Sequence, residues 1–432
     1  MLVTQAFILA ITQNLFAQKP MPAKPQTKPI VLIGGTAHLG NGQIIENAFI
    51  RFEKGIITEI TTTNPTLESQ TAGADVIRTT GKHIYPGFIL PNSSLGLTEI
   101  QAVRASNDLI EVGTYNPHIR SLIAYNTDSD IIPTIRNNGV LLVQTRPQGA
   151  TISGQSSIFE LDGWNWEDAV LQPDDGIHLN WIPMFTHTSW REGDRNLKKN
   201  ENRTQAIADL ENFMNEALSY AQTPNPTPKN YKLEAMKGLF DGSKRLYIHV
   251  NFSREIVESI QFAQKMKIKK IVVVGGRDAL QVADFLRDNQ IPVLLERVHR
   301  LPSYEEEGVF NPYQLPMLLK KAGILVGLTY DSNEPMGSRN LPFLAGTAAA
   351  YGLSKEDALM TITLNTAQIL GIDQKVGSLE KGKHATLFVS SGDALDMRTN
   401  IVEVAFIQGK QILLEDKQKY LFRMYQEKYN LK

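Results

Sequence analysis

The chain has 432 residues, 42% hydrophobic and 21% charged, which is enough to bury a large core in one or two domains. A net charge of -1, a sequence pI near 6.7 and the lack of a sustained basic run argue against nucleic acid and anionic membranes as partners. The absence of cysteine excludes disulfides, thiolate metal ligands and cysteine nucleophiles.

Residues 1–17 are predicted to form a secretory signal peptide. Val3 to Phe16 is mostly apolar, Ala17 provides a small residue at the cleavage point, and a polar, Pro-rich linker follows over residues 18–28. We therefore expect export, to the periplasm. The apolar run is interrupted and no Lys or Arg precedes it, so a frayed N-terminal segment is the alternative. No later stretch has the roughly 20 consecutive apolar residues of a membrane helix.

The pattern of residues 29–83 predicts a small β-rich region. Ile30 to Ile33, Gln43 to Phe52 and Ile56 to Ile60 are short apolar or alternating runs. Turn dipeptides such as Asn41-Gly42 and Lys54-Gly55 separate them, and this pattern predicts a β-meander.

Residues 84–370 alternate between short apolar runs and longer segments with helical spacing. The runs that we interpret as strands are Gly139–Val143, Leu179–Met184, Leu246–Val250, Lys270–Val274, Pro292–Leu295 and Ile324–Leu328. Repeated strand, helix and strand predict parallel strands with crossover helices, in a barrel or a doubly wound sheet. The region is slightly longer than the roughly 250 residues of a typical (β/α)8 barrel. A barrel fits if Thr186 to Asn230 is an expanded loop.

Beyond residue 370 the strand pattern returns, with Thr386 to Val389 and Val402 to Ile407. Residues 29–83 and 371–414 are therefore expected to join in one composite β-sandwich, and residues 415–432 to form a C-terminal helix.

Four motifs support a more specific interpretation: Gly81 to Ile89, the strand that carries His249, Ala367 to Gly371, and Val376 to Lys383. In this order they resemble the amidohydrolase superfamily, especially its imidazolonepropionase-like members. The resemblance implies a (β/α)8 TIM barrel that holds one or two divalent metal ions at the C-terminal ends of its strands. The metal would activate water for attack on an amide or cyclic amide.

The positions that the resemblance assigns to metal ligands are only partly filled. Asn92 and Ser94 stand where relatives carry a His-x-His pair, and the sixth-strand end, Val273 to Gly276, has no histidine. His249 matches the fifth-strand ligand, and Asp331 matches the eighth-strand residue that also carries the proton. A catalytic zinc normally has three protein ligands, so we expect a degenerate site that holds one zinc ion weakly or not at all.

Other residues could complete or line the site. His187, His299 or Glu296 could supply a third ligand, and Asn92, Ser93, Ser94 and Glu296 are predicted to line the pocket. The structural alternatives are a packing role for His249 and a loop or helix-capping role for Asp331. Gly149 to Ser157 is interpreted as a small-residue loop at the active face.

The resemblance implies a hydrolase for carbon–nitrogen bonds other than peptide bonds, with a small-molecule ligand. One alternative is a catalytically inactive pseudo-amidohydrolase that binds a ligand, forms a homo-oligomer or pairs with an active relative. Another is metal-free acid–base catalysis by His249 and Asp331, which requires the two side chains within about 2.6 to 3.2 Å, directly or through one water.

Overall fold

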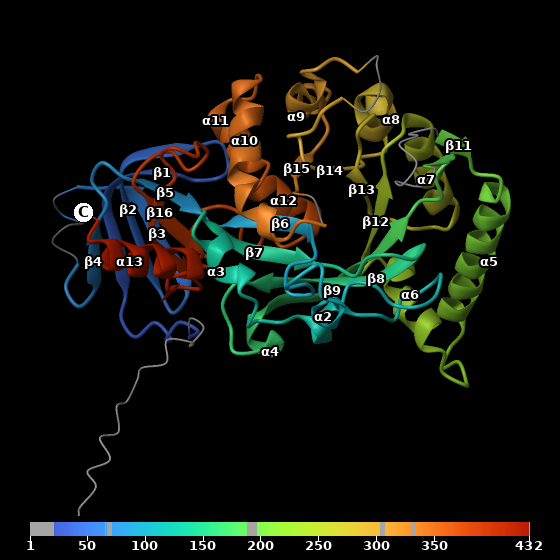
Figure 1. Cartoon of the computed structure of the whole chain (residues 1–432), viewed down its shortest axis with the longest axis horizontal. Helices are drawn as coiled ribbons and strands as arrows, with labels where there is room; N and C mark the ends of the chain where they lie inside the picture. The colour runs from blue at the N-terminus through green and yellow to red at the C-terminus, as the bar shows by residue number, and fades with distance from the viewer. Residues whose placement is uncertain are drawn as a thin grey trace, which may run out of the picture.

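The computed structural model describes residues 21–64, 66, 71–187, 197–302, 307–330 and 333–431. The predicted signal peptide therefore lies outside the described residues. Two β-sheets organise the chain, a composite sheet on the left of Figure 1 and a barrel sheet in its centre. The described residues include no helix that is both long enough and apolar enough to span a membrane.

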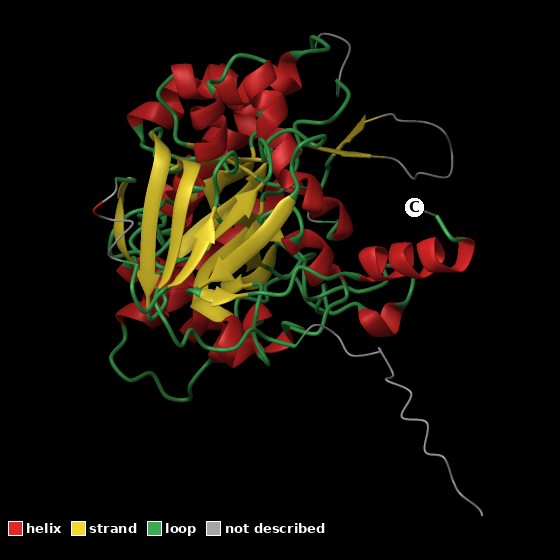
Figure 2. Ribbon diagram, turned by 90° about the vertical axis from the view of Figure 1, so that its left-hand side faces the viewer, coloured by secondary structure: helices red, strands yellow, loops and turns green. Residues whose placement is uncertain are grey.

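The composite sheet combines strands from both ends of the chain, and Figure 2 shows it in the foreground. Its strands are β1 (Ile30–His38), β2 (Ile44–Glu53), β3 (Ile56–Thr62), β4 (Asp75–Arg78), β5 (His83–Pro86), β16 (Leu387–Ser390), β17 (Val402–Ile407) and β18 (Lys410–Gln411). The join is the antiparallel pair β5 and β16, in which Tyr85 lies opposite Phe388. The two rings also stack, with centroids 5.4 Å apart, so the link between the chain ends is buried and aromatic.

The barrel sheet has the order β15-β14-β13-β12-β9-β8-β7-β6. Its strands are β6 (Phe88–Ser93), β7 (Val140–Thr145), β8 (Ile152–Glu160), β9 (Val170–Asn180), β12 (Arg245–Val250), β13 (Ile271–Gly275), β14 (Val293–Leu295) and β15 (Val326–Leu328). Many of them are continuous buried apolar runs, as expected of strands covered on both faces.

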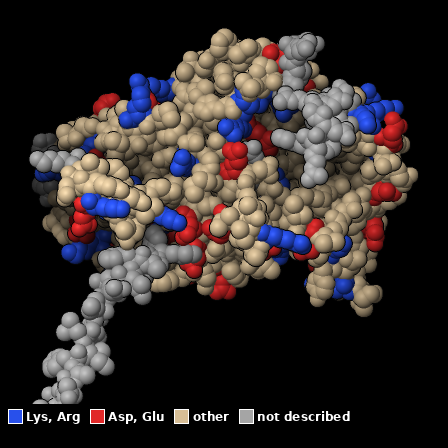
Figure 3. All heavy atoms as spheres, viewed as in Figure 1, with Lys and Arg blue, Asp and Glu red and all other residues tan. Residues whose placement is uncertain are grey.

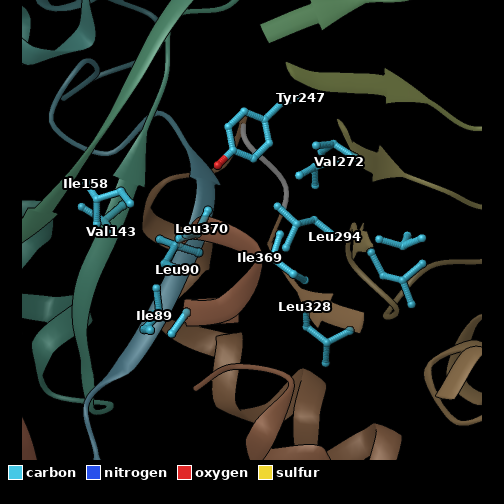
Figure 4. Packing of buried hydrophobic residues seen from close by; sticks show 14 of the residues in the cluster. Ile89, Leu90, Val143, Ile158, Tyr247, Val272, Leu294, Leu328, Ile369 and Leu370 are labelled. Carbon is cyan, nitrogen blue, oxygen red and sulfur yellow. The ribbon is translucent and has the colours of Figure 1, made fainter. Parts of the chain in front are cut away.

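The ring of strands is completed by the backbone of residues 361 and 362. The Ile89 N–H donates to the Ile362 carbonyl and the Leu328 N–H to the Thr361 carbonyl, both at 2.9 Å. The strands β6 and β15 are at the two ends of the sheet order and do not pair with each other. Residues 361 and 362 thus provide the carbonyl acceptors for backbone N–H groups at these two edges. In Figure 4, Ile369 and Leu370 of the following helix lie among the core residues between these two strands.

Helices surround the barrel, except α13, which lies at the composite-sheet end of the molecule (Figure 1). They are α2 (Ser121–Ala124), α3 (Ile131–Arg136), α4 (Trp166–Ala169), α5 (Arg203–Gln222), α6 (Tyr231–Asp241), α7 (Ser253–Lys265), α8 (Ala283–Asp288), α9 (Asn311–Lys321), α10 (Leu341–Ala350), α11 (Lys355–Met360), α12 (Leu364–Leu370) and α13 (Lys417–Tyr429). The long loop expected after β9 contains a hairpin of β10 (Phe185–His187) and β11 (Leu197–Lys199), followed by α5.

The predicted fold class, a barrel with a composite β domain from the two chain ends, is confirmed. One expectation was wrong. The segment interpreted as the loop Gly149 to Ser157 forms most of β8, which runs antiparallel to both β7 and β9. Its serines and glycine are small enough to be fully buried inside the sheet, and this composition resembled a loop in the sequence.

Candidate active site

Polar side chains fill the barrel interior near the C-terminal ends of β6, β7 and β12. Successive residues of a strand point to opposite faces, so residues two apart share a face. Gln144 and Arg146 extend inward from the end of β7, and Tyr247 and His249 extend inward from β12. Each strand therefore contributes one residue to a deeper layer and one to a layer nearer the opening.

The deeper layer is centred on Asp175, whose side chain is buried. Tyr247 Oη and Ser156 Oγ each donate to this carboxylate at 2.7 Å, and Gln144 Nε2 donates at 2.8 Å. Burial raises the pKa of Asp175, and the three hydrogen bonds oppose that rise because they favour the charged form. The arrangement fixes the orientation of Gln144.

Gln144 connects this layer to the predicted first-strand position. Its Oε1 accepts from the Asn92 backbone N–H at 3.0 Å. Asn92 has a φ of 53°, a left-handed conformation that asparagine tolerates better than most residues. The Asn92 side chain is thereby directed at a guanidinium, since Arg146 Nε donates to Asn92 Oδ1 at 2.6 Å.

Arg146 places a positive charge in the barrel. Its side chain is 5% exposed, and its Nη1 also donates to the Pro147 carbonyl at 3.0 Å. Burial lowers the pKa of Arg146 to about 10, while the charge of Glu296 opposes this shift. The guanidinium is therefore protonated at neutral pH.

His249 lies in the same layer, paired with a second histidine. Nδ1 of His178 and Nε2 of His249 are 2.9 Å apart and share a hydrogen bond. His178 is fully buried and stacks on Tyr247, whereas His249 is partly exposed. Burial, followed by the charge of Arg146, lowers the pKa of both rings well below 6.5. Both imidazoles are neutral at pH 7, and when His249 Nε2–H donates to His178, the Nδ1 of His249 can accept a proton.

The remaining predicted residues have different positions. Ser93 and Ser94 are buried beside Asn92, and the Ser93 carbonyl accepts from the Arg146 backbone N–H at 2.9 Å. Glu296 follows β14 and lines a cavity of about 500 Å³. Asp331, the predicted proton carrier, lies outside the described residues.

The two additional ligand candidates do not belong to the strands that form this polar layer. His187 is on the β10–β11 hairpin, and its side chain is outside the described residues. His299 Nε2 shares a hydrogen bond with Thr347 Oγ1 of α10 at 2.5 Å, so that nitrogen is already engaged.

Sequence reasoning missed Arg146 and His178. Arg146 directly follows β7, and a search for charged residues after every strand would have found it. The strand containing His178 was predicted to begin at Leu179, whereas β9 ends at Asn180. With the correct bounds, His178 falls inside the strand, between the apolar residues Ile177 and Leu179.

Comparison with known proteins identifies the family. The model of the "Amidohydrolase family" matches residues 60–412. This chain belongs to the amidohydrolase family. The crystal structure of an amidohydrolase from Thermotoga maritima superposes with a TM-score of 0.75 at 22% identity, covering 89% of this chain and 99% of that one. This likeness shows the fold.

Two curated relatives are named imidazolonepropionase. The one from Erwinia tasmaniensis is 29% identical over 181 residues, and the one from Flavobacterium psychrophilum is 31% identical over 109 residues. The matches cover 35% and 23% of this chain, and only 42% and 26% of the relatives. They confirm the predicted resemblance to imidazolonepropionase-like members.

Amidohydrolases generally use a divalent metal. A structure of adenosine deaminase from Xanthomonas campestris with bound zinc shares this fold with a TM-score of 0.52 at 13% identity, covering 95% of this chain and 99% of that one. Among the described residues, the donor atoms at the expected ligand positions do not fit such an ion. Asn92 Oδ1 is bonded to a guanidinium and His249 Nε2 to His178. Across the described residues, no three His, Asp or Glu side chains form a metal-binding group.

Proposed function

We propose that this amidohydrolase hydrolyses a carbon–nitrogen bond other than a peptide bond in a small cyclic amide, and that the Arg146 guanidinium provides the positive charge that a metal provides in relatives. The family match over residues 60–412 carries the proposal of hydrolysis. The names of the two curated relatives favour a cyclic amide substrate.

The site suggests how the bond would break without a metal. A water molecule adds its oxygen to the carbonyl carbon while His249 accepts a proton from that water. The carbonyl electrons move to oxygen, and Arg146 stabilises the resulting oxyanion. The carbon–nitrogen bond then breaks, and His249 returns the proton to the leaving nitrogen. Donors fixed in a dry site stabilise such a charge better than water does, because they need no reorganisation.

The hydrogen-bonded groups behind these residues would keep them in place. Asp175 holds Gln144, Gln144 holds Asn92, and Asn92 accepts from Arg146. His178 orients the His249 ring in the same way. Asp331 remains a predicted second proton carrier.

The experiment is a hydrolysis assay on cyclic amides, read by mass spectrometry as the gain of one water, with chelator-treated and zinc-loaded protein in parallel. We expect turnover that survives chelation. Arg146→Met should lower kcat by about 100- to 1,000-fold, the range for loss of one oxyanion-stabilising donor. Arg146→Lys keeps the charge, so its loss should be smaller.

Two results would overturn the proposal. Turnover that requires zinc would restore metal-dependent hydrolysis. No turnover with or without zinc, from protein that still binds cyclic amides, would favour the pseudoenzyme alternative.

A further inference from the structure

The helix α13 exposes apolar side chains that the other described residues do not cover. No residue between Lys417 and Tyr429 is buried. Phe422, Tyr425 and Tyr429 are 62%, 54% and 59% exposed, and Leu421 also lies on the surface. The helix lies at the composite-sheet end of the molecule in Figure 1, and in Figure 2 it projects from the body beside the C-terminus. These side chains are therefore accessible to a partner.

Four of these side chains form one face of the helix, which we call the aromatic face: Leu421, Phe422, Tyr425 and Tyr429. Leu421, Tyr425 and Tyr429 follow one another at intervals of four residues, and Phe422 is three residues before Tyr425. Residues at these spacings lie on the same side of a helix. The rings of Tyr425 and Tyr429 also stack, with centroids 6.1 Å apart. The aromatic face is thus continuous over the later turns of α13.

The start of α13 is anchored to the body of the protein. Asp416 caps the helix by accepting from the Lys419 N–H at 2.7 Å, and it also accepts from Asn137 Nδ2 at 2.7 Å. Gln418 Oε1 accepts from Thr134 Oγ1 of α3 at 3.0 Å. These hydrogen bonds hold the first turn in place and leave the aromatic face exposed.

The helix is basic, although the whole chain is not. Lys417, Lys419, Arg423 and Lys428 against Glu427 give the helix a charge of +3, whereas the chain carries -1. The rest of the chain therefore carries -4. The charge of the whole chain, which argued against an anionic membrane, conceals this local excess of positive charge.

Two of these lysines border the aromatic face. Lys417 is four residues before Leu421 and Lys428 is seven residues after it, so both lie on its side of the helix. Lys428 Nζ is 5.1 Å from the centroid of the Tyr429 ring and 6.0 Å from that of Tyr425. Neither lysine forms an ion pair with a described carboxylate. Their charges are thus free to act on the same partner as the aromatic face.

The size and charge of this face favour a membrane over a second copy of the chain. An aromatic side chain buries about 150 to 250 Å² in an interface, so four half-exposed side chains offer on the order of 400 Å². A stable protein interface needs about 800 Å² from each partner. Two copies would also bring together two helices of charge +3, which repel each other. In a bilayer, tyrosine rings occupy the headgroup region and lysines reach anionic lipid.

We propose that α13 is a membrane-binding helix that lies along the surface of a bilayer containing anionic lipid. The aromatic face enters the headgroup region, and Lys417 and Lys428 contact lipid phosphates. The helix does not cross the bilayer, because it is neither long nor apolar enough to do so. The inference is independent of the proposed hydrolysis.

The test is flotation of the full chain with vesicles of phosphatidylcholine, either alone or mixed with phosphatidylglycerol. The chain should bind the anionic vesicles at least about tenfold more tightly than the neutral ones, since each lysine near such a surface contributes about fivefold. This preference should fall at about 1 M salt, where the Debye length is only about 3 Å.

Two variants separate the charge from the aromatic face. Lys417→Glu with Lys428→Glu should remove the preference for anionic vesicles. Tyr425→Ser should weaken binding to both kinds of vesicle by about fivefold or more, because it removes apolar area from the headgroup region. These side chains are exposed, so the variants should remain folded.

Matched control variants carry the same changes elsewhere on the surface. Lys269→Glu with Lys270→Glu makes the same change in net charge at exposed positions, and Tyr231→Ser removes a tyrosine that is 72% exposed. Both controls should bind vesicles as the parent does. Every variant keeps the apolar residues Val3 to Phe16, so a difference between variants reports on α13 alone.

Several results would overturn the inference. They are no binding to anionic vesicles, equal binding to both kinds of vesicle, and unchanged binding in the α13 variants. Analytical ultracentrifugation adds one more: a dimer that Tyr425→Ser dissociates and Tyr231→Ser does not would assign the aromatic face to a second copy of the chain.

Discussion

The two sides of the barrel opening differ in how their polar groups are paired. On the side of β6 to β9, Asn92, Gln144 and Asp175 are buried and hydrogen-bonded to one another in sequence. On the side of β13 and β14, Arg277 lines a cavity, and its side chain forms no hydrogen bond or ion pair with a described residue. Paired, buried groups are rigid, whereas an unpaired charge at a cavity is available to a ligand. The first side is suited to positioning reacting groups and the second to binding.

The surface does not reveal this division. On the face shown in Figure 3, basic and acidic residues are interspersed over a larger neutral area. The charge that distinguishes the two sides lies inside the barrel opening, where a low dielectric strengthens its interactions.

The largest expected effect is a loss of protein stability when the hydrogen-bonded groups on the side of β6 to β9 are changed. Asp175→Ala removes the carboxylate that accepts from three buried donors and should lower the free energy of unfolding by about 3 to 5 kcal/mol. Tyr247→Phe removes only one donor and should cost about 1 kcal/mol. Urea unfolding followed by circular dichroism measures both. If Asp175→Ala lowers the free energy of unfolding by less than Tyr247→Phe does, Asp175 does not hold the deeper layer together.

The second prediction concerns metal binding and Arg146. The double variant Asn92→His with Ser94→His restores two imidazoles, but the nearby guanidinium should still repel a divalent ion. Adding Arg146→Ala should raise zinc affinity by at least about tenfold over the double variant, or about 1.4 kcal/mol. Mass spectrometric metal analysis after equilibration with micromolar zinc gives the comparison. Equal zinc content would mean that Arg146 does not oppose the metal.

The third prediction concerns pH. The folded-state pKa of His178 is depressed, whereas in the unfolded chain the ring takes up a proton near pH 6.5. Its contribution to stability is therefore present above pH 6.5 and is lost as pH falls toward the folded pKa. For this one ring, the free energy of unfolding falls by at most about 1.4 kcal/mol for each pH unit. Unfolding midpoints at pH 7.5 and 5.5 should differ more for the native protein than for His178→Gln. If the midpoint changes equally with pH in both proteins, the His178 ring is not neutral in the folded state.

The smallest effect on protein stability is expected from a change on the side of β13 and β14. Arg277→Gln removes no side-chain hydrogen bond to a described residue, so it should change the free energy of unfolding by less than about 0.5 kcal/mol. The same urea titration measures it beside Asp175→Ala. A cost above 2 kcal/mol would show that Arg277 stabilises the fold and that the two sides do not differ as described.

The sequence predicted the architecture well because the signals of strands and turns are local. Apolar runs such as the one ending at Val274 mark strands in a single chain, and motifs such as Val376 to Lys383 added the family. The strand β8 was missed because serine and glycine are frequent in loops, and only burial in the barrel explains them in a strand.

The site was predicted less well because its contacts join distant positions. His249 was selected for its place at a strand end, but its partner His178 is 71 positions earlier in the chain. Arg146 and Asn92 are likewise 54 positions apart. The family resemblance pointed to Asn92 and Ser94 as ligand positions. It gave no reason to consider Arg146, the charged residue that follows the next strand.

The join between β5 and β16 has a consequence for synthesis on the ribosome. β5 ends at Pro86, and its partner β16 begins only at Leu387, after every strand of the barrel sheet. Until then the edge of β5 that β16 will cover has no strand beside it, and such edges are prone to wrong pairing. The barrel can complete its sheet before the domain that precedes it in the chain. Folding would then proceed from the middle outward, and the first strands made would be among the last to be paired.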